Sequence, residues 1–415
     1  MKIEEEKAKI AIVVPSISEG GGVPTVARFI KDSILRSGEF DLKLVSLATS
    51  QADGCSVQLK KPSTWFAGVR MKEGEWDGLP YFHVGCMASE FEFQRLKPRP
   101  LLQEVLSDCD IIQVVSGSPA WALSVTGMGK PVALQVATRA IVERRRKDRV
   151  DRGPLAWWHW LMTHITDKRD DEALRKVDVV QVENIWMQEY AQTIGSEHGT
   201  WVRFAPPGVD AKDFHPVYQR LHSGMTDRYI LSVGRFDDPR KNIELLLEAY
   251  ALMRFSMKDP PRLLLAGASG PSSAFWNRVR ELDLEDCVSF HLRPTREQLV
   301  RYYQQALCFA LSSDEEGFGV VLAEAMACAV PVVATRCGGP EGIITDAVNG
   351  FLVPMGNALM LANRMQLLAQ NMALNERMGQ AGRLTVENRF TLEIAGEAFL
   401  DTYRKLLQKH TGKVN

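Results

Sequence analysis

Residues 312–327 read S-S-D-E-E-G-F-G-V-V-L-A-E-A-M-A, and this stretch decides the fold of the second half of the chain. The apolar run Cys308–Leu311 precedes it and a helix-like run follows, which predicts a strand, a glycine loop and a helix. Such a loop lets backbone N–H groups approach a ligand, and the helix N-terminus favours an anion. Glu316 and Glu324 flank the loop and the start of the helix. A phosphate on the loop, with carboxylates for sugar hydroxyls, is what a nucleotide-sugar site requires.

The alternative interpretation of this stretch makes Glu316 and Glu324 ordinary surface carboxylates. The neighbouring residues argue against it, because most of residues 318–326 are apolar and a surface helix would be more polar. A buried carboxylate without partners is costly, so either glutamate, if buried, needs a hydrogen-bonding or charged partner.

Length and composition restrict the class of protein. At 415 residues the chain predicts two or three domains, and its net charge of -1 argues against a nucleic-acid partner. No apolar run reaches the roughly 18 residues of a membrane span, and residues 1–10 lack a signal-peptide core. The seven cysteines form no C-x-x-C pair. We therefore expect reduced thiols in a cytoplasmic protein and do not expect the cysteines to bind metal.

The first half of the chain alternates strand-like and helical segments. The run Lys9–Ile17 predicts a buried strand, three glycines interrupt it, and a helix follows that ends at Gly38. Residues 50–100 predict a short strand pair within irregular loops. The further predicted strands of this half are Phe40–Leu47, Asp110–Val115, Val132–Val136 and Val177–Val182. This alternation predicts a doubly wound, largely parallel sheet.

A proline-rich break at Ala205–Asp210 separates a second alternating series. Its predicted strands are Tyr229–Val233, Arg262–Ala266, Val288–His291, Cys308–Leu311 and Pro331–Ala334, and its predicted helices lie near 241–257, 272–284, 295–306, 319–328 and 357–388. The amphipathic stretch Leu392–Gln408 follows. Two Rossmann-like halves would face a cleft, with ligands at the carboxyl ends of the strands.

Three further loops follow predicted strands. Gly20, Gly21 and Gly22 follow the first strand and are a weak signal, since many helices begin with glycine. In the loop that begins at Gly234, Arg235 and Lys241 could both reach a diphosphate, Arg as a planar fork and Lys as a point charge. The alternative for that loop is a solvated basic turn. Residues 338–341 form another glycine loop at the same predicted sheet edge.

Together these motifs resemble the GT-B fold glycosyltransferases of family 4, a retaining, nucleotide-sugar-dependent class. The resemblance covers nearly the whole chain and is strongest over about 205–355. Its most specific part is E-G-F-G-x-x-x-x-E-A-M-A, the E-x7-E motif of Glu316 and Glu324. The supporting motifs are G-R-x-x-x-x-K-N, P-P-G-V-D, G-G-P-E and N-G-F-L-V-P. It implies an N-terminal acceptor-side domain at 1–205, a nucleotide-sugar-binding domain at 206–390 and a C-terminal helix at 391–415 that crosses back to the first domain.

The resemblance also implies roles for individual residues. Glu324 would hold the ribose hydroxyls, Glu316 would contact the donor sugar, and Arg235 and Lys241 would neutralise the leaving diphosphate. The segment Gly317, Phe318 and Gly319 would present backbone N–H groups to the donor. The base would lie near Arg293, and Gly20 to Gly22 would approach the phosphate from the N-terminal half.

On this basis we expect a hexosyltransferase that uses a UDP-, GDP- or ADP-sugar and no metal. Its acceptor would be a sugar or lipid-linked hydroxyl, in polysaccharide, lipopolysaccharide or glycolipid biosynthesis, and the chain would be a monomer. Members of the family commonly have a histidine after the strand here predicted at Val132–Val136, where this chain has none. Thr138 or Arg139 could substitute for it. The alternatives are a GT-B fold nucleotide-sugar epimerase and a non-catalytic nucleotide-sugar-binding or partner protein.

Residues 144–162 indicate where in the cell the protein could act. Residues 144–147 are basic and residues 157–162 contain three tryptophans, a combination that suits an anionic membrane surface. We therefore expect peripheral contact with the inner membrane face through 144–162. In the alternative, the tryptophans are core residues of a helix at 154–176 and the arginines are solvated.

Overall fold

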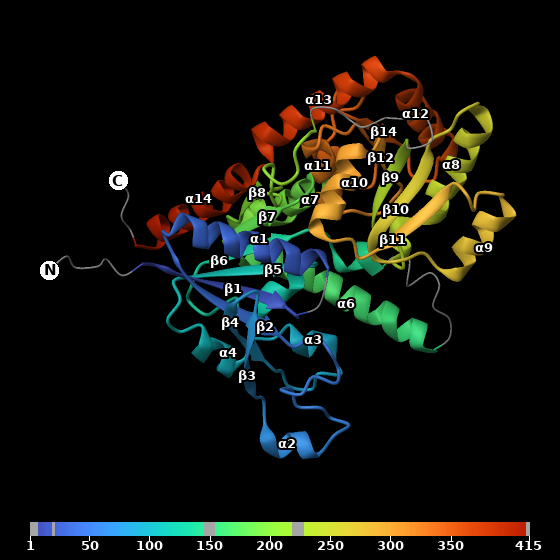
Figure 1. Ribbon diagram of the computed structural model, residues 1–415. Coiled ribbons are helices and arrows are strands. Elements are labelled where there is room, and N and C mark those ends of the chain that lie inside the picture. The colour runs from blue at the N-terminus through green and yellow to red at the C-terminus, as the bar shows by residue number, and fades with distance from the viewer. Residues whose placement is uncertain (1–6, 19–20, 145–153, 218–227, 412–415) are drawn as a thin grey trace. The chain divides into compact units, whose positions relative to one another are not determined.

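The computed structural model describes residues 7–18, 21–144, 154–217 and 228–411. The chain divides into two compact units (Figure 1). Unit 1 comprises Met1–Pro207 with Ala395–Asn415, and unit 2 comprises Gly208–Ile394. Each unit has its own sheet with helices packed on it, and the predicted α/β class with parallel sheets is confirmed.

Unit 1 contains an eight-stranded sheet in the order β3-β4-β2-β1-β5-β6-β7-β8. All of its pairs are parallel except the hairpin of β3 and β4, which is the strand pair predicted within residues 50–100. The strands are β1 (Lys9–Pro15), β2 (Asp41–Leu47), β3 (Met71–Trp76), β4 (Leu79–Val84), β5 (Ile111–Ser116), β6 (Val132–Val136), β7 (Val179–Val182) and β8 (Trp201–Phe204). The helices are α1 (Gly22–Ser37), α2 (Ser63–Ala67), α3 (Glu92–Arg95), α4 (Pro100–Val105), η1 (Pro119–Ser124), α6 (Pro154–Lys176), α7 (Ile185–Gly195), η2 (Ser196–His198) and α14 (Leu392–Thr411).

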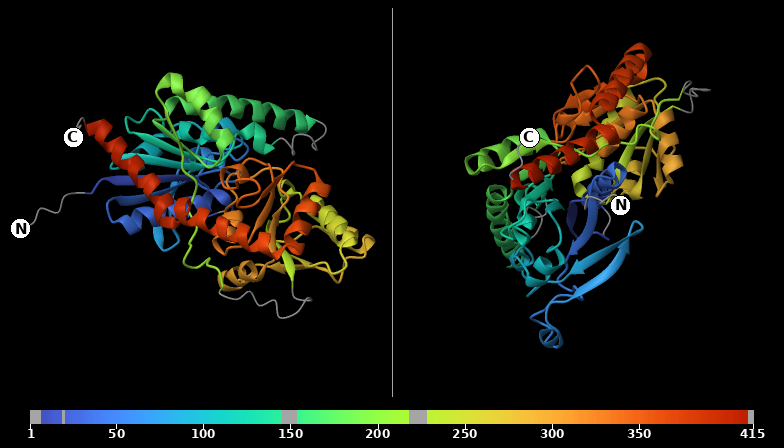
Figure 2. Two further views of the ribbon diagram at one scale, coloured as in Figure 1. Left: turned by 90° about the horizontal axis from the view of Figure 1, so that it is seen from above. Right: turned by 90° about the vertical axis from the view of Figure 1, so that its left-hand side faces the viewer.

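The last helix, α14, packs on the unit 1 sheet together with α1 (Figure 2). Phe399 of α14 makes an edge-to-face contact with Phe29 of α1, with ring centroids 5.8 Å apart. Tyr403 donates a hydrogen bond of 2.9 Å to buried Gln113 of β5. Because side chains alternate along a strand, the neighbours of Gln113 point to the opposite face, where Met187 of α7 joins the core.

Unit 2 contains a six-stranded parallel sheet in the order β11-β10-β9-β12-β13-β14. The strand order reverses between β9 and β12, as in a Rossmann fold, so this is the point at which such sheets bind ligands. The strands are β9 (Tyr229–Arg235), β10 (Arg262–Ser269), β11 (Val288–Leu292), β12 (Cys308–Leu311), β13 (Val332–Thr335) and β14 (Phe351–Val353). The helices are η4 (Pro239–Lys241), α8 (Ile243–Ser256), α9 (Ser273–Glu281), α10 (Arg296–Gln305), α11 (Val320–Ala327), η5 (Pro340–Gly342), α12 (Ala358–Gln370) and α13 (Met372–Arg389).

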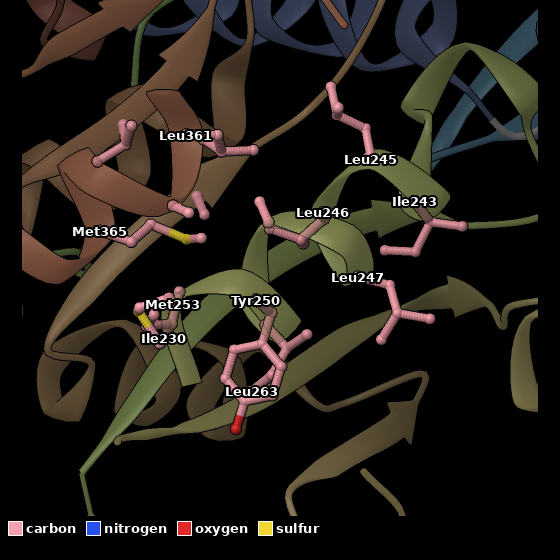
Figure 3. Close-up of a cluster of buried hydrophobic side chains, with 14 of the residues drawn as sticks. Ile230, Ile243, Leu245, Leu246, Leu247, Tyr250, Met253, Leu263, Leu361 and Met365 are labelled. Atoms are coloured by element: carbon pink, nitrogen blue, oxygen red, sulfur yellow. The ribbon is translucent and has the colours of Figure 1, made fainter. Parts of the chain in front are cut away.

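The core of unit 2 lies between the sheet and the helix pair α8 and α12 (Figure 3). Leu246, Tyr250 and Met253 of α8 are fully buried and face Leu361 and Met365 of α12. Burying one side chain of this size stabilises the folded state by about 1.5–3 kcal/mol, compared with leaving it exposed. This packing holds β9, and therefore the loop that follows it, in a fixed position.

Several boundaries differ from the predictions. The single helix predicted at 357–388 is two helices, because Asn371 adopts a non-helical conformation and its side chain accepts from the backbone N–H of Leu374. The first strand ends at Pro15, since Ser16 has a φ of 51°. The strands β8 and β14, each of at most four residues, were not predicted, because so short a run carries little periodicity.

Candidate functional site

The strand order of the unit 2 sheet reverses between β9 and β12. Hydrogen bonds join the loops that follow these two strands. The backbone N–H of Asp314 donates to the carbonyl of Arg240 at 2.8 Å, and Ser312 Oγ donates to the carbonyl of Lys241 at 3.0 Å. Asn242 Nδ2 donates to Asp314 Oδ1 at 2.8 Å. These contacts place the G-R-x-x-x-x-K-N loop directly beside the E-x7-E loop.

An ion pair joins the same two loops. Lys241 Nζ lies 2.6 Å from Glu316 Oε1, and the two side chains are 19% and 10% exposed. Ser313 Oγ donates to the same carboxylate oxygen at 2.6 Å. Two predicted site residues that are 75 positions apart in the sequence are therefore in direct contact, and both side chains are largely buried.

The glycine loop after β13 lies against Glu316 as well. The backbone N–H of Glu316 donates to the carbonyl of Cys337, and that of Gly339 donates to the carbonyl of Glu316 at 3.0 Å. A Cβ atom on Gly339 would lie 2.5 Å from the carbonyl oxygen of Phe318, so only glycine allows this approach. The loops after β9, β12 and β13 therefore gather at one edge of the unit 2 sheet.

Helix α11 begins directly after this loop. Gly319 precedes it with a φ of 89°, in the left-handed region that favours glycine. Phe318 is 2% exposed and packs edge-to-face on Phe390, so its side chain anchors the loop and its backbone carries any ligand contact. The N-terminus of α11 is thereby fixed next to the Lys241–Glu316 pair, and a helix N-terminus favours an anion.

Glu324 lies in the second turn of α11. Its Oε2 accepts a hydrogen bond of 2.8 Å from the hydroxyl of fully buried Tyr303. Burial raises the pKa of Glu324 to about 7, although the Tyr303 hydrogen bond and the charge of Arg296 act in the opposite direction. Tyr303 was not predicted as a site residue, because nothing in the sequence pattern of α10 distinguishes a tyrosine that binds a carboxylate from a core tyrosine.

The other predicted site residues are placed as follows. Arg235 is the last residue of β9, is 46% exposed, and pairs with Asp238 at 3.3 Å. Arg293 follows β11 with a φ of 47°, and its backbone N–H donates to the carbonyl of Gly267 at 2.7 Å. Gly21 and Gly22 lie in unit 1 at the start of α1, and Gly20 is outside the described residues. Gly317 lies in the loop before α11.

In unit 1, Arg139 could substitute for the missing histidine, but its side chain already has other partners. Arg139 pairs with Asp167 at 2.8 Å, and its guanidinium lies 3.9 Å from the ring centroid of Tyr190. The side chain is thus held in a network with helices α6 and α7. Thr138 is 6% exposed and lies in the same loop.

Unit 1 also contains two buried carboxylates. Asp170 of α6 accepts from the backbone N–H groups of Ala120 and Ala140, both at 2.8 Å, which fixes the loops after β5 and β6. Glu183, directly after β7, accepts from Gln135 Nε2 at 3.2 Å. Burial raises the pKa of both carboxyl groups to about 7.

Within the described residues, the alternative interpretation of the tryptophan segment is wrong. Trp157 and Trp160 of α6 are 62% and 48% exposed, so they are not core residues of that helix. Arg144 is not simply solvated, because its guanidinium forms a bidentate pair with Glu92. The remaining basic residues, 145–147, lie outside the described residues. No helix in the described ranges is both long and apolar enough to cross a membrane.

The segment Asp108-Cys109-Asp110, which has Asp-x-Asp spacing, lies between α4 and β5. Asp108 pairs with both Lys9 and Lys43, and these two cations hold the pKa of Asp108 well below its usual range. Asp110 accepts from the backbone N–H of Lys9 at 2.7 Å. Both carboxylates therefore have structural partners, namely two lysine side chains and a backbone N–H group.

Comparison with known proteins agrees with this geometry. Residues 218–385 match the family described as Glycosyl transferases group 1. The D-inositol 3-phosphate glycosyltransferase of Saccharomonospora viridis is 31% identical over 225 residues, which are 51% of this chain and 52% of that protein. The protein of the same name from Kineococcus radiotolerans is 33% identical over 225 residues, 49% of this chain and 51% of that protein. The chain thus spans about half the length of the curated relatives it matches.

Solved structures match over almost the full length. Sucrose-phosphate synthase from Thermosynechococcus elongatus has a TM-score of 0.70 at 22% identity, covering 97% of this chain and 100% of that one. Anabaena Alr3699/HepE in complex with UDP has a TM-score of 0.66 at 16% identity, covering 96% and 100%.

The solved structures confirm the predicted GT-B fold, and the match over residues 218–385 supports the predicted resemblance to glycosyltransferases in unit 2. Residues 218–385 match the group 1 glycosyl transferases, while the assignment to family 4 stays a prediction.

Proposed function

We propose that the protein is a retaining glycosyltransferase that moves a hexose-type sugar from a nucleoside diphosphate sugar to a hydroxyl acceptor. The observation that carries the proposal is the contact between Lys241 and Glu316 at the point where the unit 2 sheet reverses its strand order. A cation and a carboxylate side by side at this point suit a diphosphate and a sugar hydroxyl, respectively.

In this proposal the leaving diphosphate is stabilised without a metal ion. Lys241, Arg235 and the N-terminus of α11 supply the positive potential, and a preorganised cationic site lowers the barrier for departure of the anion. The bond between the anomeric carbon and the phosphate oxygen breaks, and the acceptor oxygen bonds to the same face of the sugar. The acceptor proton passes to the leaving phosphate. This front-face course follows from the family resemblance.

Glu324 would accept hydrogen bonds from the ribose hydroxyls of the donor. An ionised carboxylate accepts more strongly than a neutral acid. Because burial raises the pKa of Glu324 to about 7, binding should release a proton near that pH. Nucleotide affinity should therefore increase between pH 6 and pH 8 in the wild type, and this increase should be absent from Glu324→Gln.

The first test is a thermal-shift screen against UDP, GDP and ADP and their sugars, with and without EDTA. A ligand that binds only the folded state raises the melting temperature. At a ligand concentration of 100 times its Kd, the free energy of unfolding increases by about 2.7 kcal/mol. One nucleotide that gives a shift in EDTA supports a metal-free donor site, and no shift from any of them contradicts the proposal.

Turnover separates the remaining alternatives. A transferase hydrolyses its donor slowly or passes the sugar to an acceptor, whereas a non-catalytic nucleotide-sugar-binding protein does neither. An epimerase would convert the donor into its epimer without releasing nucleotide. Inositol phosphate belongs among the acceptors tested, because curated relatives carry that substrate in their names. Polysaccharide and lipid-linked acceptors complete the panel, since we propose a role in polysaccharide, lipopolysaccharide or glycolipid synthesis.

We also propose a cytoplasmic monomer in peripheral contact with the membrane. The exposed Trp157 and Trp160 of α6 support the contact through 144–162. A second segment of the same chemistry surrounds α2, which precedes β3 in the chain and lies at the bottom of the view in Figure 1. There Phe66 is 97% and Trp65 54% exposed, and residues 59–72 hold four Lys or Arg and no carboxylate.

Flotation with anionic vesicles tests this contact. The wild type should float, and the doubly substituted Trp157→Ala/Trp158→Ala and Trp65→Ala/Phe66→Ala variants show which segment is responsible. Binding should weaken as salt is raised, because the cations at the surface are screened. A wild type that stays in solution at low salt contradicts the proposed membrane contact and leaves the donor site unaffected.

A further inference from the structure

Three side chains of unit 1 bring different metal-ligating atoms together. Asp53, Cys55 and His83 offer an oxygen, a sulfur and a nitrogen that all lie within 4.8 Å of one another. Asp53 and Cys55 lie in the loop after β2, and His83 is in β4. Because β2 and β4 are parallel neighbours with Ser46 opposite His83, the loop after β2 passes back over the histidine. No other group of this kind occurs in the part of the chain that the structure describes.

The remaining polar atoms of the carboxylate and the imidazole already have partners. Asp53 Oδ1 accepts from Ser56 Oγ at 2.7 Å and from the backbone N–H of Cys55 at 3.0 Å. Asp53 Oδ2 and His83 Nε2 form a hydrogen bond of 2.7 Å with each other, which a bound ion would replace. On the far side of the ring, His83 Nδ1 lies 3.1 Å from Ser46 Oγ. Such outer contacts fix the orientation of metal-binding carboxylates and histidines.

The loop is also held in place before any ion binds. A Cβ atom on Gly85 would lie 2.0 Å from the carbonyl oxygen of Cys55, so the backbone after β4 touches the loop directly. The backbone N–H of Arg70 donates to that same carbonyl at 2.8 Å. The side chains of Asp53 and His83 are 12% and 20% exposed, which leaves a path for a small ion. An ion would therefore meet an ordered, partly open site.

We propose that Asp53 Oδ2, Cys55 Sγ and His83 Nε2 bind a zinc-type transition-metal ion. A mixed oxygen, sulfur and nitrogen set suits Zn²⁺ and its spectroscopic substitute Co²⁺, whereas Mg²⁺ and Ca²⁺ prefer oxygen ligands alone. Binding releases the proton of the Cys55 thiol and leaves the ring hydrogen of His83 on Nδ1, beside Ser46 Oγ, because the ligand atoms bind metal in their unprotonated forms. Three protein ligands leave the fourth tetrahedral position to water.

This site is independent of the proposed donor site. Its residues belong to unit 1, whereas Lys241, Glu316 and Glu324 belong to unit 2. Metal binding by a cysteine was not predicted from the sequence, because the cysteines form no C-x-x-C pair. The set here uses one cysteine, and its other two ligands are recognisable only once β4 lies beside β2.

The experiment is a titration of the EDTA-treated, dialysed full-length protein with Co²⁺ and with Zn²⁺. We expect one equivalent of Co²⁺ per chain, with a thiolate-to-cobalt charge-transfer band, and competition by Zn²⁺. Cys55→Ser should lose the band, and Cys55→Ser and His83→Ala should each weaken Zn²⁺ binding by at least about 100-fold. Cys109→Ser and His198→Ala, in the same unit, are the matched controls and should bind as the wild type does.

Cys55→Ser is the decisive variant, because it removes the sulfur and leaves the Asp53–His83 contact intact. EDTA should lower the melting temperature of the zinc-loaded wild type and should have no effect on Cys55→Ser. If the wild type binds no Co²⁺, or if Cys55→Ser binds it with the same band, the proposal is overturned and the cluster is a hydrogen-bonded loop contact only. The nucleotide-induced thermal shift of Cys55→Ser, measured alongside, reports separately on the donor site.

Discussion

At the scale of single residues, Lys241 is the side chain whose removal best separates function from stability. Lys241→Ala should lower kcat by about 100-fold or more, because a cation aimed at the leaving group is lost. The melting temperature should change much less than the activity, since Glu316 keeps the hydrogen bond from Ser313 Oγ when the lysine is removed. Lys258→Ala, an exposed lysine of the same unit, is the control for assays of both properties. A Lys241→Ala protein that melts far lower would make this lysine a structural residue.

A second prediction at this scale concerns Glu183. Its pKa of about 7 in the folded protein exceeds the ordinary value of 4.5, so the folded state binds the proton more tightly than the unfolded state does. The resulting stabilisation is complete below about pH 4 and is lost as pH rises through 7. It amounts to about 3 kcal/mol. Glu183→Gln stays neutral, so its melting temperature should exceed that of the wild type at pH 8 and approach it at pH 5.

The comparison between the two proteins isolates Glu183, because Asp170 titrates in both of them. Thermal unfolding followed by circular dichroism at pH 5, 6, 7 and 8 gives the measurement. Parallel pH profiles for wild type and Glu183→Gln would mean that the carboxyl group is ionised in the folded state.

At the scale of secondary-structure elements, the carboxyl ends of β9 and β10 approach so closely that a side chain does not fit between them. A Cβ atom on Gly267 would lie 1.8 Å from the carbonyl oxygen of Gly234, a backbone atom that cannot rotate away. Gly267→Ala should therefore force the strands apart, cost about 1–3 kcal/mol, and abolish the nucleotide-induced thermal shift.

Gly234→Ala is a matched control for this prediction. A Cβ atom at that position meets nothing closer than 3.5 Å, which is ordinary van der Waals contact. Its melting temperature should stay near that of the wild type. Equal melting temperatures for Gly267→Ala and Gly234→Ala would show that the two strand ends are not held at this distance.

At the scale of the whole molecule, the sequence was sufficient for the α/β class and for most strands, because buried parallel strands are continuous apolar runs. It was also sufficient to bring the Lys241 loop and the Glu316 loop to one sheet edge, since both follow strands. It did not predict the Tyr303–Glu324 hydrogen bond or the Asp53–Cys55–His83 group. Those contacts join residues from separate elements, and only the packed structure determines which side chains meet.

The two units also have separate cores, and this predicts how the whole chain unfolds. The unit 2 core contains no residue of unit 1. Of the nine tryptophans only Trp276 lies in unit 2, so tryptophan fluorescence reports chiefly on unit 1, whereas circular dichroism reports on both. A nucleotide bound by unit 2 stabilises that unit by linkage. It should therefore raise part of the circular dichroism transition and move the fluorescence transition less. Identical shifts by both probes would instead show that the units unfold as a single cooperative block.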